Sequence, residues 1–228
     1  MSVLNSEKAR YFARVFFYLR LYRKYRERTM VPPLAYAENL ALIARALDDP
    51  ALDGGGIVEC GTWRGGMSAG MIEVGGPGRQ YFFFDSFEGL PPVQEVDGPK
   101  ALKWQSDQTA RRFGNCDASR DEFEATIRMT GCPPEIIHIA KGFFEQTFPD
   151  FIPPPVAVLR LDADWYASTA ICLEKFWDCV LPGGLILIDD YYAWDGCSRA
   201  IHDGLAKRQA TERVCQTPFS RGAFIVKQ

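Results

Sequence analysis

The sequence predicts a single α/β domain, in which helices cover both faces of a mostly parallel, doubly wound β-sheet. Two observations carry this prediction. Short, nearly continuous apolar segments alternate with helical segments from about residue 55 onward, and such strands are typical of sheets buried on both faces. The first strand also continues directly into a glycine-rich turn and a helix. A length of 228 residues, 47% of them hydrophobic, suits one full core.

Residues 1–50 are predicted to form a helical extension that packs on the α/β domain at 51–228. The first 28 residues hold eight Lys or Arg against two Glu, whereas the whole chain has a net charge of −3. Apolar side chains recur there at helical spacing, which predicts an amphipathic helix; they are Phe12, Val15, Phe16, Leu19 and Tyr22. Two roles stay open for this helix: packing on its own domain or a second subunit, and binding to a membrane surface.

The remaining elements follow in a regular order. Helices are expected over about 36–48, 66–74, 121–131, 168–180 and 196–208, with Ser119 as the N-cap of the third and Gly131 as its stop. Strands are expected at 55–60, 81–86, 135–142, 155–164 and 185–192, followed by a terminal antiparallel hairpin of 213–218 and 222–228. Residues 87–118 are polar, irregular and rich in proline. A loop of that length is usually functional or disordered, and its composition fits a mobile lid.

Polar side chains end each of the first five predicted strands. In open α/β sheets, ligands bind outside the carboxyl ends of the strands. Residues that are distant in sequence therefore converge on one edge of the sheet. They are Glu59, Asp85, Lys141, Asp162 with Asp164, and Asp189 with Asp190.

The first half of this edge fits a nucleoside bound to a cationic amino acid. Gly61 allows a sharp turn, and Gly65 and Gly66 let the backbone approach a ligand, although a purely structural turn is the alternative. The turn has neither the GxGxxG nor the P-loop pattern. Asp85 can accept both hydroxyls of a ribose. Glu59 would repel a pyrophosphate, so S-adenosylmethionine is favoured over NAD.

Two further positions extend this prediction to the adenine ring. Phe87 follows Asp85 and is expected to cover the ring. Lys141, Gly142 and Phe143 end the third strand, where an edge of the adenine would lie.

The second half of this edge of the sheet carries several acidic side chains close together. The carboxylates of Asp162, Asp189 and Asp190 repel one another unless they are protonated or neutralised by a cation. Mg²⁺, which prefers oxygen ligands and keeps open positions for a substrate, is the economical solution. A hydroxyl bound to such an ion loses its proton more easily and is held in place. The alternative is that some of the acids cap helices or pair with Arg160 or Arg199.

The two histidines and the amino-acid composition narrow the range of possible functions further. His138 is expected in the core, and His202 is a weak candidate for a base. The acidic body after residue 28 argues against nucleic-acid binding. Seven scattered cysteines without a CxxC motif indicate a reducing, cytoplasmic compartment. No apolar run approaches the roughly 18 residues that span a bilayer, and residues 11–22 are a poor signal peptide.

Four strings together resemble the macrocin O-methyltransferases, which methylate sugar hydroxyls on macrolide and related antibiotics. They are ECGTWRGGMS, FDSFEGLP, LRLDADWYAST and LILIDDYYAWDG. The resemblance covers roughly residues 29–228. It implies a seven-stranded, Rossmann-like class I methyltransferase fold, S-adenosylmethionine as donor and Mg²⁺ dependence. It also implies an oligomer in which N-terminal helices help to cover the site.

The same resemblance assigns residues to the two halves of the site. The Mg²⁺ ligands would be Asp162, Asp189 and Asp190, with Asp162 and Asp164 as catalytic residues; whether Asp164 binds the metal or accepts the proton stays open. Thr29 and Met30 match a segment that reaches over the donor. The expected donor-binding set is Thr29, Met30, Glu59, Gly61, Thr62, Gly65, Ser68, Asp85, Ser86, Phe87, Lys141, Gly142, Phe143 and Asp162.

The leading hypothesis is an O-methyltransferase acting on a sugar hydroxyl of a glycosylated natural product or a similar polyol. Two alternatives stay open. One is a catechol-type enzyme with an aromatic diol as acceptor, because the aromatic residues of the loops stack on either ring type. The other is a binding protein that holds S-adenosylmethionine without catalysis.

Overall fold

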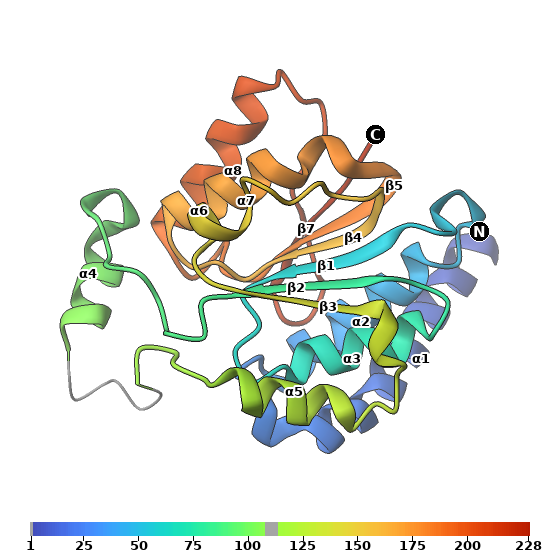
Figure 1. Cartoon of the computed structure of the whole chain (residues 1–228). Helices are drawn as coiled ribbons and strands as arrows, with labels where there is room; N and C mark the ends of the chain where they lie inside the picture. The colour runs from blue at the N-terminus through green and yellow to red at the C-terminus, as the bar shows by residue number, and fades with distance from the viewer. Residues whose placement is uncertain (1, 108–113) are drawn as a thin grey trace.

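The computed structural model describes residues 2–107 and 114–228 of the chain. In it, seven strands form one sheet in the order β3-β2-β1-β4-β5-β7-β6, and β1 to β5 are parallel (Figure 1). The last two strands form the antiparallel hairpin expected from the sequence. The strands are β1 (Gly56–Cys60), β2 (Tyr81–Asp85), β3 (Ile137–Lys141), β4 (Val156–Leu161), β5 (Val180–Ile188), β6 (Cys215–Gln216) and β7 (Ala223–Val226).

Helices cover both faces of this sheet, as the sequence predicted (Figure 1). One face carries α1 (Ser2–Tyr25), α2 (Pro33–Ala46), α3 (Gly66–Gly75) and α5 (Arg120–Arg128). The other carries α6 (Phe144–Thr147), α7 (Tyr166–Phe176) and α8 (Asp195–Lys207). The remaining helix, α4 (Gly98–Ser106), stands beyond the carboxyl ends of the strands. Successive strands are added on one side of β1 up to β3 and on its other side from β4 onward, so the strand order reverses between β1 and β4, and such a switch point opens a crevice for a ligand.

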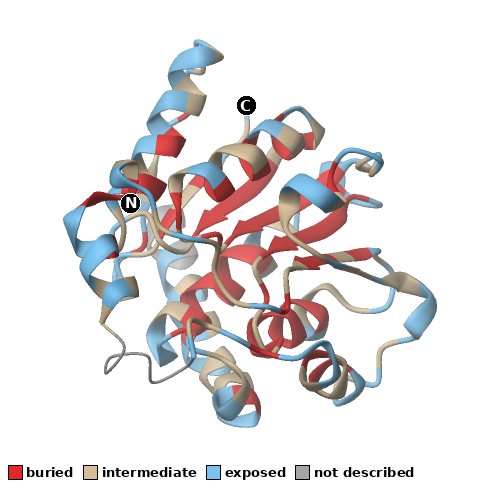
Figure 2. Cartoon of the chain, turned by 60° about the vertical axis from the view of Figure 1, so that its left-hand side comes forward, coloured by how far each residue is buried: buried red, intermediate tan, exposed pale blue. Residues whose placement is uncertain are grey.

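The core consists of two apolar layers separated by the sheet. One joins the strands to α2 and α3 through residues such as Leu40, Ile57 and Met71. The other joins them to α7 and α8. Figure 2 shows that the central strands are buried along their length. They therefore form a rigid base for the loops at their carboxyl ends.

Two elements differ from the sequence prediction, and a third begins where it was predicted. Residues 98–106 form α4 inside the segment that was expected to be irregular, because Pro99 lies in the first turn of a helix, where proline is favoured. β5 begins at Val180 instead of residue 185, since Val180 already pairs with Val156 of β4. The capping box of Ser119 with Glu122 begins α5, as predicted.

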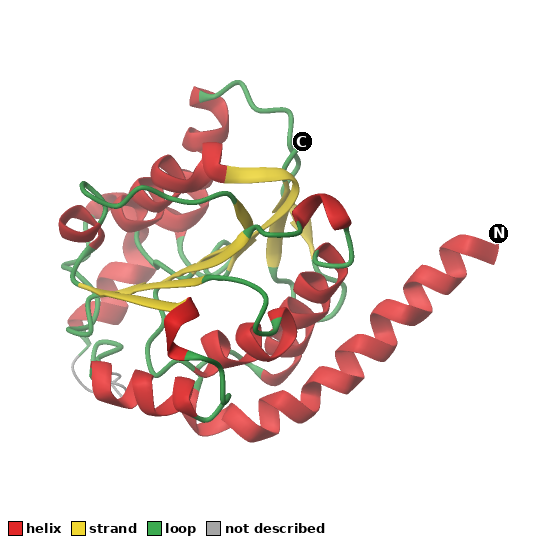
Figure 3. Cartoon of the chain, turned by 45° about the vertical axis from the view of Figure 1, so that its right-hand side comes forward, coloured by secondary structure: helices red, strands yellow, loops and turns green. Residues whose placement is uncertain are grey.

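The buried face of α1 was predicted wrongly in part. Val15 is 2% exposed, but Phe12 is 38% and Phe16 70% exposed. The helix instead turns Tyr11 and Tyr18 toward the body, and the Tyr11 hydroxyl donates a hydrogen bond to Glu38 at 3.0 Å. Aromatic residues lie all around this helix, so their spacing alone does not identify the packed face. Figure 3 shows the N-terminal half of α1 extending past the body.

His138 was expected in the core but is exposed. It lies on β3, which is an edge strand of the sheet. Its ring stacks on Phe82, with centroids 4.7 Å apart. The apolar run around it suggested burial on both faces, but an edge strand is covered less completely.

Candidate active site

A cavity of about 260 Å³ opens at the carboxyl ends of the parallel strands. Loops after all five of these strands line it, as the strand-end rule predicted. The N-terminal segment at residues 29–32 forms a further part of its wall. The predicted residues in the lining are Thr29, Met30, Gly61, Thr62, Asp85, Ser86, Gly142, Phe143, Asp162, Asp164, Asp189 and Asp190.

The loop after β1 is shaped by close contact with β4. Gly61 has a φ of +86°, and a Cβ there would lie 1.8 Å from the carbonyl oxygen of Asp162. Only glycine fits both the conformation and the space. This contact brings the first loop directly against the acidic end of β4.

Asp85 binds this loop through its backbone. Its Oδ2 accepts hydrogen bonds from the N–H groups of Thr62 at 2.7 Å and Trp63 at 2.9 Å. Its Oδ1 accepts from the N–H of Phe87 at 2.7 Å. The carboxylate therefore fixes the loops after β1 and β2 relative to each other, at the mouth of the cavity.

Glu59 and Ser68 lie behind the cavity wall and are 0% exposed. The Ser68 hydroxyl donates a hydrogen bond to Glu59 Oε2. Arg160 donates to the other oxygen of Glu59 at 2.8 Å. Burial raises the pKa of Glu59 to about 7, against the opposing effect of Arg160. Glu59 is not part of the cavity lining, and its contacts with Ser68 and Arg160 place it beneath the floor of the site.

Three other predicted donor-binding residues are outside the lining as well. Gly65 leaves room for the ring of Phe123, which a Cβ would approach to 2.7 Å. Phe87 is 6% exposed and packs on Phe123, with centroids 5.6 Å apart. The exposed Lys141 lies near Glu88, with Nζ and Oε1 3.7 Å apart.

The segment of Thr29 and Met30 crosses the start of α3. A Cβ on Gly66 would lie 2.5 Å from the carbonyl oxygen of Arg28 and 2.8 Å from Cβ of Thr29. Gly66 thus lets the N-terminal segment approach, in addition to shaping the turn. This contact places residues 29 and 30 at the cavity.

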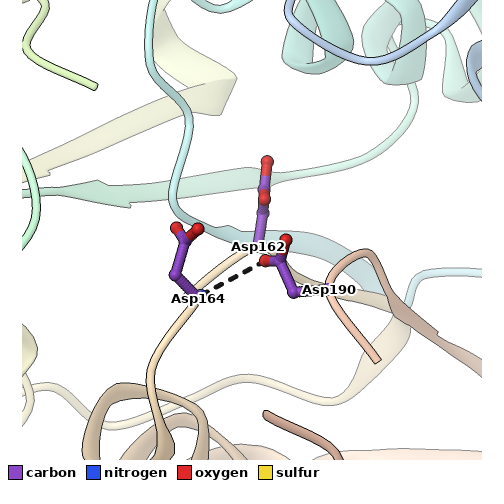
Figure 4. Close-up of side chains that lie close together, drawn as sticks. All are labelled: Asp162, Asp164 and Asp190. Atoms are coloured by element: carbon purple, nitrogen blue, oxygen red, sulfur yellow. Dashed lines mark hydrogen bonds between the residues drawn. The ribbon is translucent and has the colours of Figure 1, made fainter. Parts of the chain in front are cut away.

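Three carboxylates gather at the far side of the cavity. Each of Asp162, Asp164 and Asp190 offers an oxygen, and these oxygens lie within 4.8 Å of one another (Figure 4). The backbone N–H of Asp164 donates a hydrogen bond to Asp190 Oδ2 at 3.2 Å. Asp164 has a φ of +54°, a left-handed conformation that costs energy in non-glycine residues and is frequent at functional sites.

Asp189 is set apart from this cluster by Arg160. Arg160 is 1% exposed, and its Nη2 lies 2.7 Å from Asp189 Oδ1. Its Nη1 lies 2.8 Å from Asp162 Oδ2 and 2.8 Å from Glu59 Oε1. Pairing with Arg160, which the sequence left open as an alternative, therefore occurs for two of the rim acids. One buried cation joins the floor of the donor side to the acidic side.

The environment makes the unpaired acids hard to ionise. Burial, and then the charge of Asp162, raises the pKa of Asp164. Burial, and then the charges of Asp164 and Asp162, raises the pKa of Asp190 well above its ordinary value. The pKa of Asp162 is also raised by burial, although Arg160 opposes the rise. A cluster of this kind is stabilised by a bound cation.

Other residues of the site were not found from the sequence. Trp63, Met67, Cys116, Glu145 and the segment 89–91 also line the cavity. Trp63 lies inside the glycine turn and could have been inferred from its place, whereas the others carry no local signal. His202 lies on α8, within 2.8 Å of the Tyr191 hydroxyl, and is not part of the lining.

The strand order, the glycine loop after β1 and the acidic ends of β4 and β5 define a Rossmann-like methyltransferase fold. The chain belongs to the macrocin-O-methyltransferase (TylF) family, whose family model matches residues 35–219. The family resemblance of the four sequence strings is thereby confirmed.

Two curated relatives are O-methyltransferases by name, and the first name contains a rhamnosyl group. The chain is 34% identical over 153 residues to the 8-demethyl-8-(2,3-dimethoxy-alpha-L-rhamnosyl)-tetracenomycin-C 4'-O-methyltransferase of Streptomyces olivaceus, a match covering 65% of this chain and 57% of the relative. It is 31% identical to the demethyldecarbamoylnovobiocin O-methyltransferase of Streptomyces niveus, covering 67% and 59%. The chain thus spans about three-fifths of the length of these relatives.

A solved structure supports the fold. The O-methyltransferase NovP superimposes with a TM-score of 0.72 at 26% identity, covering 86% of this chain and 81% of NovP. Within residues 2–107 and 114–228, no helix combines the length and apolarity needed to cross a membrane. All seven cysteines lie in these ranges, and all are free thiols.

Proposed function

We propose that the protein is an S-adenosylmethionine- and Mg²⁺-dependent O-methyltransferase that acts on a sugar hydroxyl of a glycosylated natural product. One observation carries the proposal: a single cavity joins a glycine loop tied to Asp85 with a cluster of three carboxylates. The rhamnosyl group in the name of the Streptomyces olivaceus relative supports the acceptor class.

The donor would occupy the side formed by the loops after β1, β2 and β3. Gly61 and Thr62 supply backbone at close approach, and Gly142 and Phe143 line the opposite edge. Asp85 keeps this side in shape and lies where ribose hydroxyls would compete for its oxygens. Met30 and its neighbours would cover the donor from above.

The acid cluster fits a hard divalent cation by its donor chemistry. Oxygens of Asp162, Asp164 and Asp190 lie within 4.8 Å of one another, and carboxylate oxygens are the ligands that Mg²⁺ prefers. We infer that Asp162 and Asp190 hold the ion, joined by Asp189 through the oxygen that Arg160 leaves free. When bound, Mg²⁺ lowers the pKa of an acceptor hydroxyl, and S-adenosylmethionine supplies the methyl group.

In this proposal the carboxylate of Asp164 accepts the proton of the acceptor hydroxyl. It makes no ion pair with Arg160, and its carboxylate faces the cavity beside Asp162 and Asp190 (Figure 4). In the transfer, the acceptor O–H bond breaks and its proton moves to Asp164. The new C–O bond forms as the C–S bond of the donor breaks.

Assembly and location complete the proposal. Phe12, Phe16 and Phe17 leave apolar surface on α1 exposed, which supports a homo-oligomer built on this helix. The free thiols support a reducing, cytoplasmic compartment.

The test is a methyl-transfer screen with purified protein, S-adenosylmethionine and a panel of rhamnosides, other glycosides and catechols, with and without EDTA. The proposal expects transfer to a glycoside and its loss with EDTA. Methyl transfer that survives EDTA would contradict the proposed Mg²⁺ dependence, and transfer to catechols alone would point to the catechol-type alternative. Binding of S-adenosylhomocysteine without transfer to any acceptor would leave the binding-protein alternative.

A further inference from the structure

Asp164 is held at two points, and both depend on the turn that follows β5. Its backbone N–H donates to Asp190 Oδ2 at 3.2 Å, and its Oδ1 accepts from the indole Nε1–H of Trp194 at 3.0 Å. Trp194 in turn donates its backbone N–H to the carbonyl oxygen of Asp190 at 3.0 Å. The three residues therefore close a ring of hydrogen bonds, in which the five-residue turn from Asp190 to Trp194 clamps Asp164.

The position of the Trp194 ring is itself fixed by aromatic contacts. It packs against Trp165, with centroids 5.3 Å apart, and against Trp104 of α4 at 5.8 Å. Lys100 lies over the same ring, 5.0 Å from its centroid, and donates a hydrogen bond to the carbonyl oxygen of Ala193 at 3.0 Å. These contacts hold the ring so that its indole N–H points at Asp164. Figure 4 shows where the Asp164 carboxylate lies.

The hydrogen bonds to Asp164 also offset the energetic cost of its left-handed backbone conformation. Asp164 has a φ of +54°, and left-handed residues persist only where their surroundings fix them. The left-handed backbone turns the Asp164 carboxylate toward those of Asp162 and Asp190. Without a partner, this carboxylate would turn away from two neighbours of like charge.

We propose that Trp194 is the positioning residue for Asp164: its indole N–H holds the Asp164 carboxylate against the acceptor hydroxyl beside Asp162 and Asp190. This inference rests on the proposed function, because it takes Asp164 as the group that receives the proton. Trp194 is not part of the cavity lining, so it would act on the acceptor only through Asp164.

The variant Trp194→Phe tests this, since it keeps an aromatic ring and removes the donor. The matched control is Trp104→Phe, which makes the same change in the same aromatic cluster without touching a carboxylate. Displacement of a reacting group by about 1 Å costs roughly 100-fold in rate. Trp194→Phe is therefore expected to lower kcat about 10- to 100-fold while KM for the donor stays within about twofold. Trp104→Phe is expected to stay within about threefold of wild type in both constants.

A second readout needs no activity. The five tryptophans give five indole N–H resonances in a ¹⁵N–¹H spectrum, and Trp194→Phe identifies one of them by its loss. Asp164→Ala removes the acceptor and is expected to shift that resonance most, whereas Trp104→Phe leaves it in the range of a hydrogen-bonded indole.

An unmoved resonance in Asp164→Ala, or equal kcat values in Trp194→Phe and Trp104→Phe, would overturn the proposal. Failure of the proposed function has a different signature. In that case the wild-type protein transfers no methyl group to any acceptor, and the resonance still reports whether Trp194 holds Asp164.

Discussion

The two sides of the cavity are built by different means. On the donor side, Asp85 accepts three backbone N–H groups within 2.9 Å, so its charge is satisfied inside the protein. On the acceptor side, Asp164 and Asp190 have no cationic partner among the described residues, and their pKa values are raised. The donor side is preorganised by hydrogen bonds within the protein, whereas the acceptor side needs a bound cation to neutralise its carboxylates. Substitutions on the two sides should therefore respond differently to Mg²⁺.

Arg160 joins the two sides, so its loss should have the largest effect. Arg160→Met is expected to lower the free energy of unfolding of the metal-free protein by about 3–5 kcal/mol, because it leaves the buried Glu59 and the partly buried Asp162 and Asp189 without a cation. Denaturant unfolding with and without Mg²⁺ measures this. Mg²⁺ should stabilise the variant more than the wild type. A loss below 1 kcal/mol would contradict the central role of Arg160.

Asp164→Asn should separate chemistry from binding. The amide keeps the shape and the hydrogen bond from Trp194 but cannot accept the proton. We expect kcat to fall at least about 100-fold, as for loss of a general base, with unchanged affinity for S-adenosylhomocysteine. Steady-state kinetics and calorimetry measure the two. Asp150→Asn, at an exposed acid outside the cavity lining, is the control. A variant with normal kcat would remove Asp164 from the chemistry.

Asp85→Ala should act on the donor side alone. It removes the acceptor for the N–H groups of Thr62, Trp63 and Phe87, each a hydrogen bond to a charged group worth about 1.5–3 kcal/mol. Affinity for S-adenosylhomocysteine should fall about tenfold or more, while Mg²⁺ affinity stays within about twofold. Calorimetry of each ligand checks this. An equal loss of both affinities would show that the two sides are not independent.

The smallest expected effect is on thermal stability as a function of pH. The folded-state pKa of Asp164 is raised to about 7, above an unfolded value of about 3.9. The unfolded state therefore loses its proton first, and the stability contribution falls between about pH 4 and pH 7. The metal-free protein should melt a few degrees lower at pH 7.5 than at pH 5.5, and Mg²⁺ should narrow the difference. A steeper slope in Asp164→Asn than in wild type would contradict this origin.

The donor side could be predicted from the sequence more completely than the acceptor side. The parallel sheet, Gly61 and Asp85 follow from local patterns, because strand, turn and acid are adjacent in the chain. The partner of Glu59 did not follow, since Arg160 lies 101 residues away and reaches it only through the pairing of β1 with β4. Pairing of the rim acids with Arg160 was one of the alternatives, but the apolar neighbours of Arg160 in β4 do not indicate that its side chain also reaches the buried Glu59.

The acceptor side was predicted in composition but not in arrangement. The chain order placed Asp189 and Asp190 together, yet one pairs with Arg160 and the other joins Asp162 and Asp164. The clamp on Asp164 by Trp194 spans 30 residues and depends on a tight turn. Helix α4 does not follow from the sequence, because prolines are typical of irregular chain and only the structure places Pro99 in the first turn of a helix.

The most direct test of the two-sided site is the Mg²⁺ affinity of Asp190→Asn and Asp164→Asn, measured by titration calorimetry with S-adenosylhomocysteine bound. Both variants make the same change in the same cluster. We predict one Mg²⁺ site in wild type, an affinity at least about tenfold (1.4 kcal/mol) weaker in Asp190→Asn, and an affinity within about threefold of wild type in Asp164→Asn. Wild-type Mg²⁺ affinity in Asp190→Asn would contradict a cation held by the acid cluster.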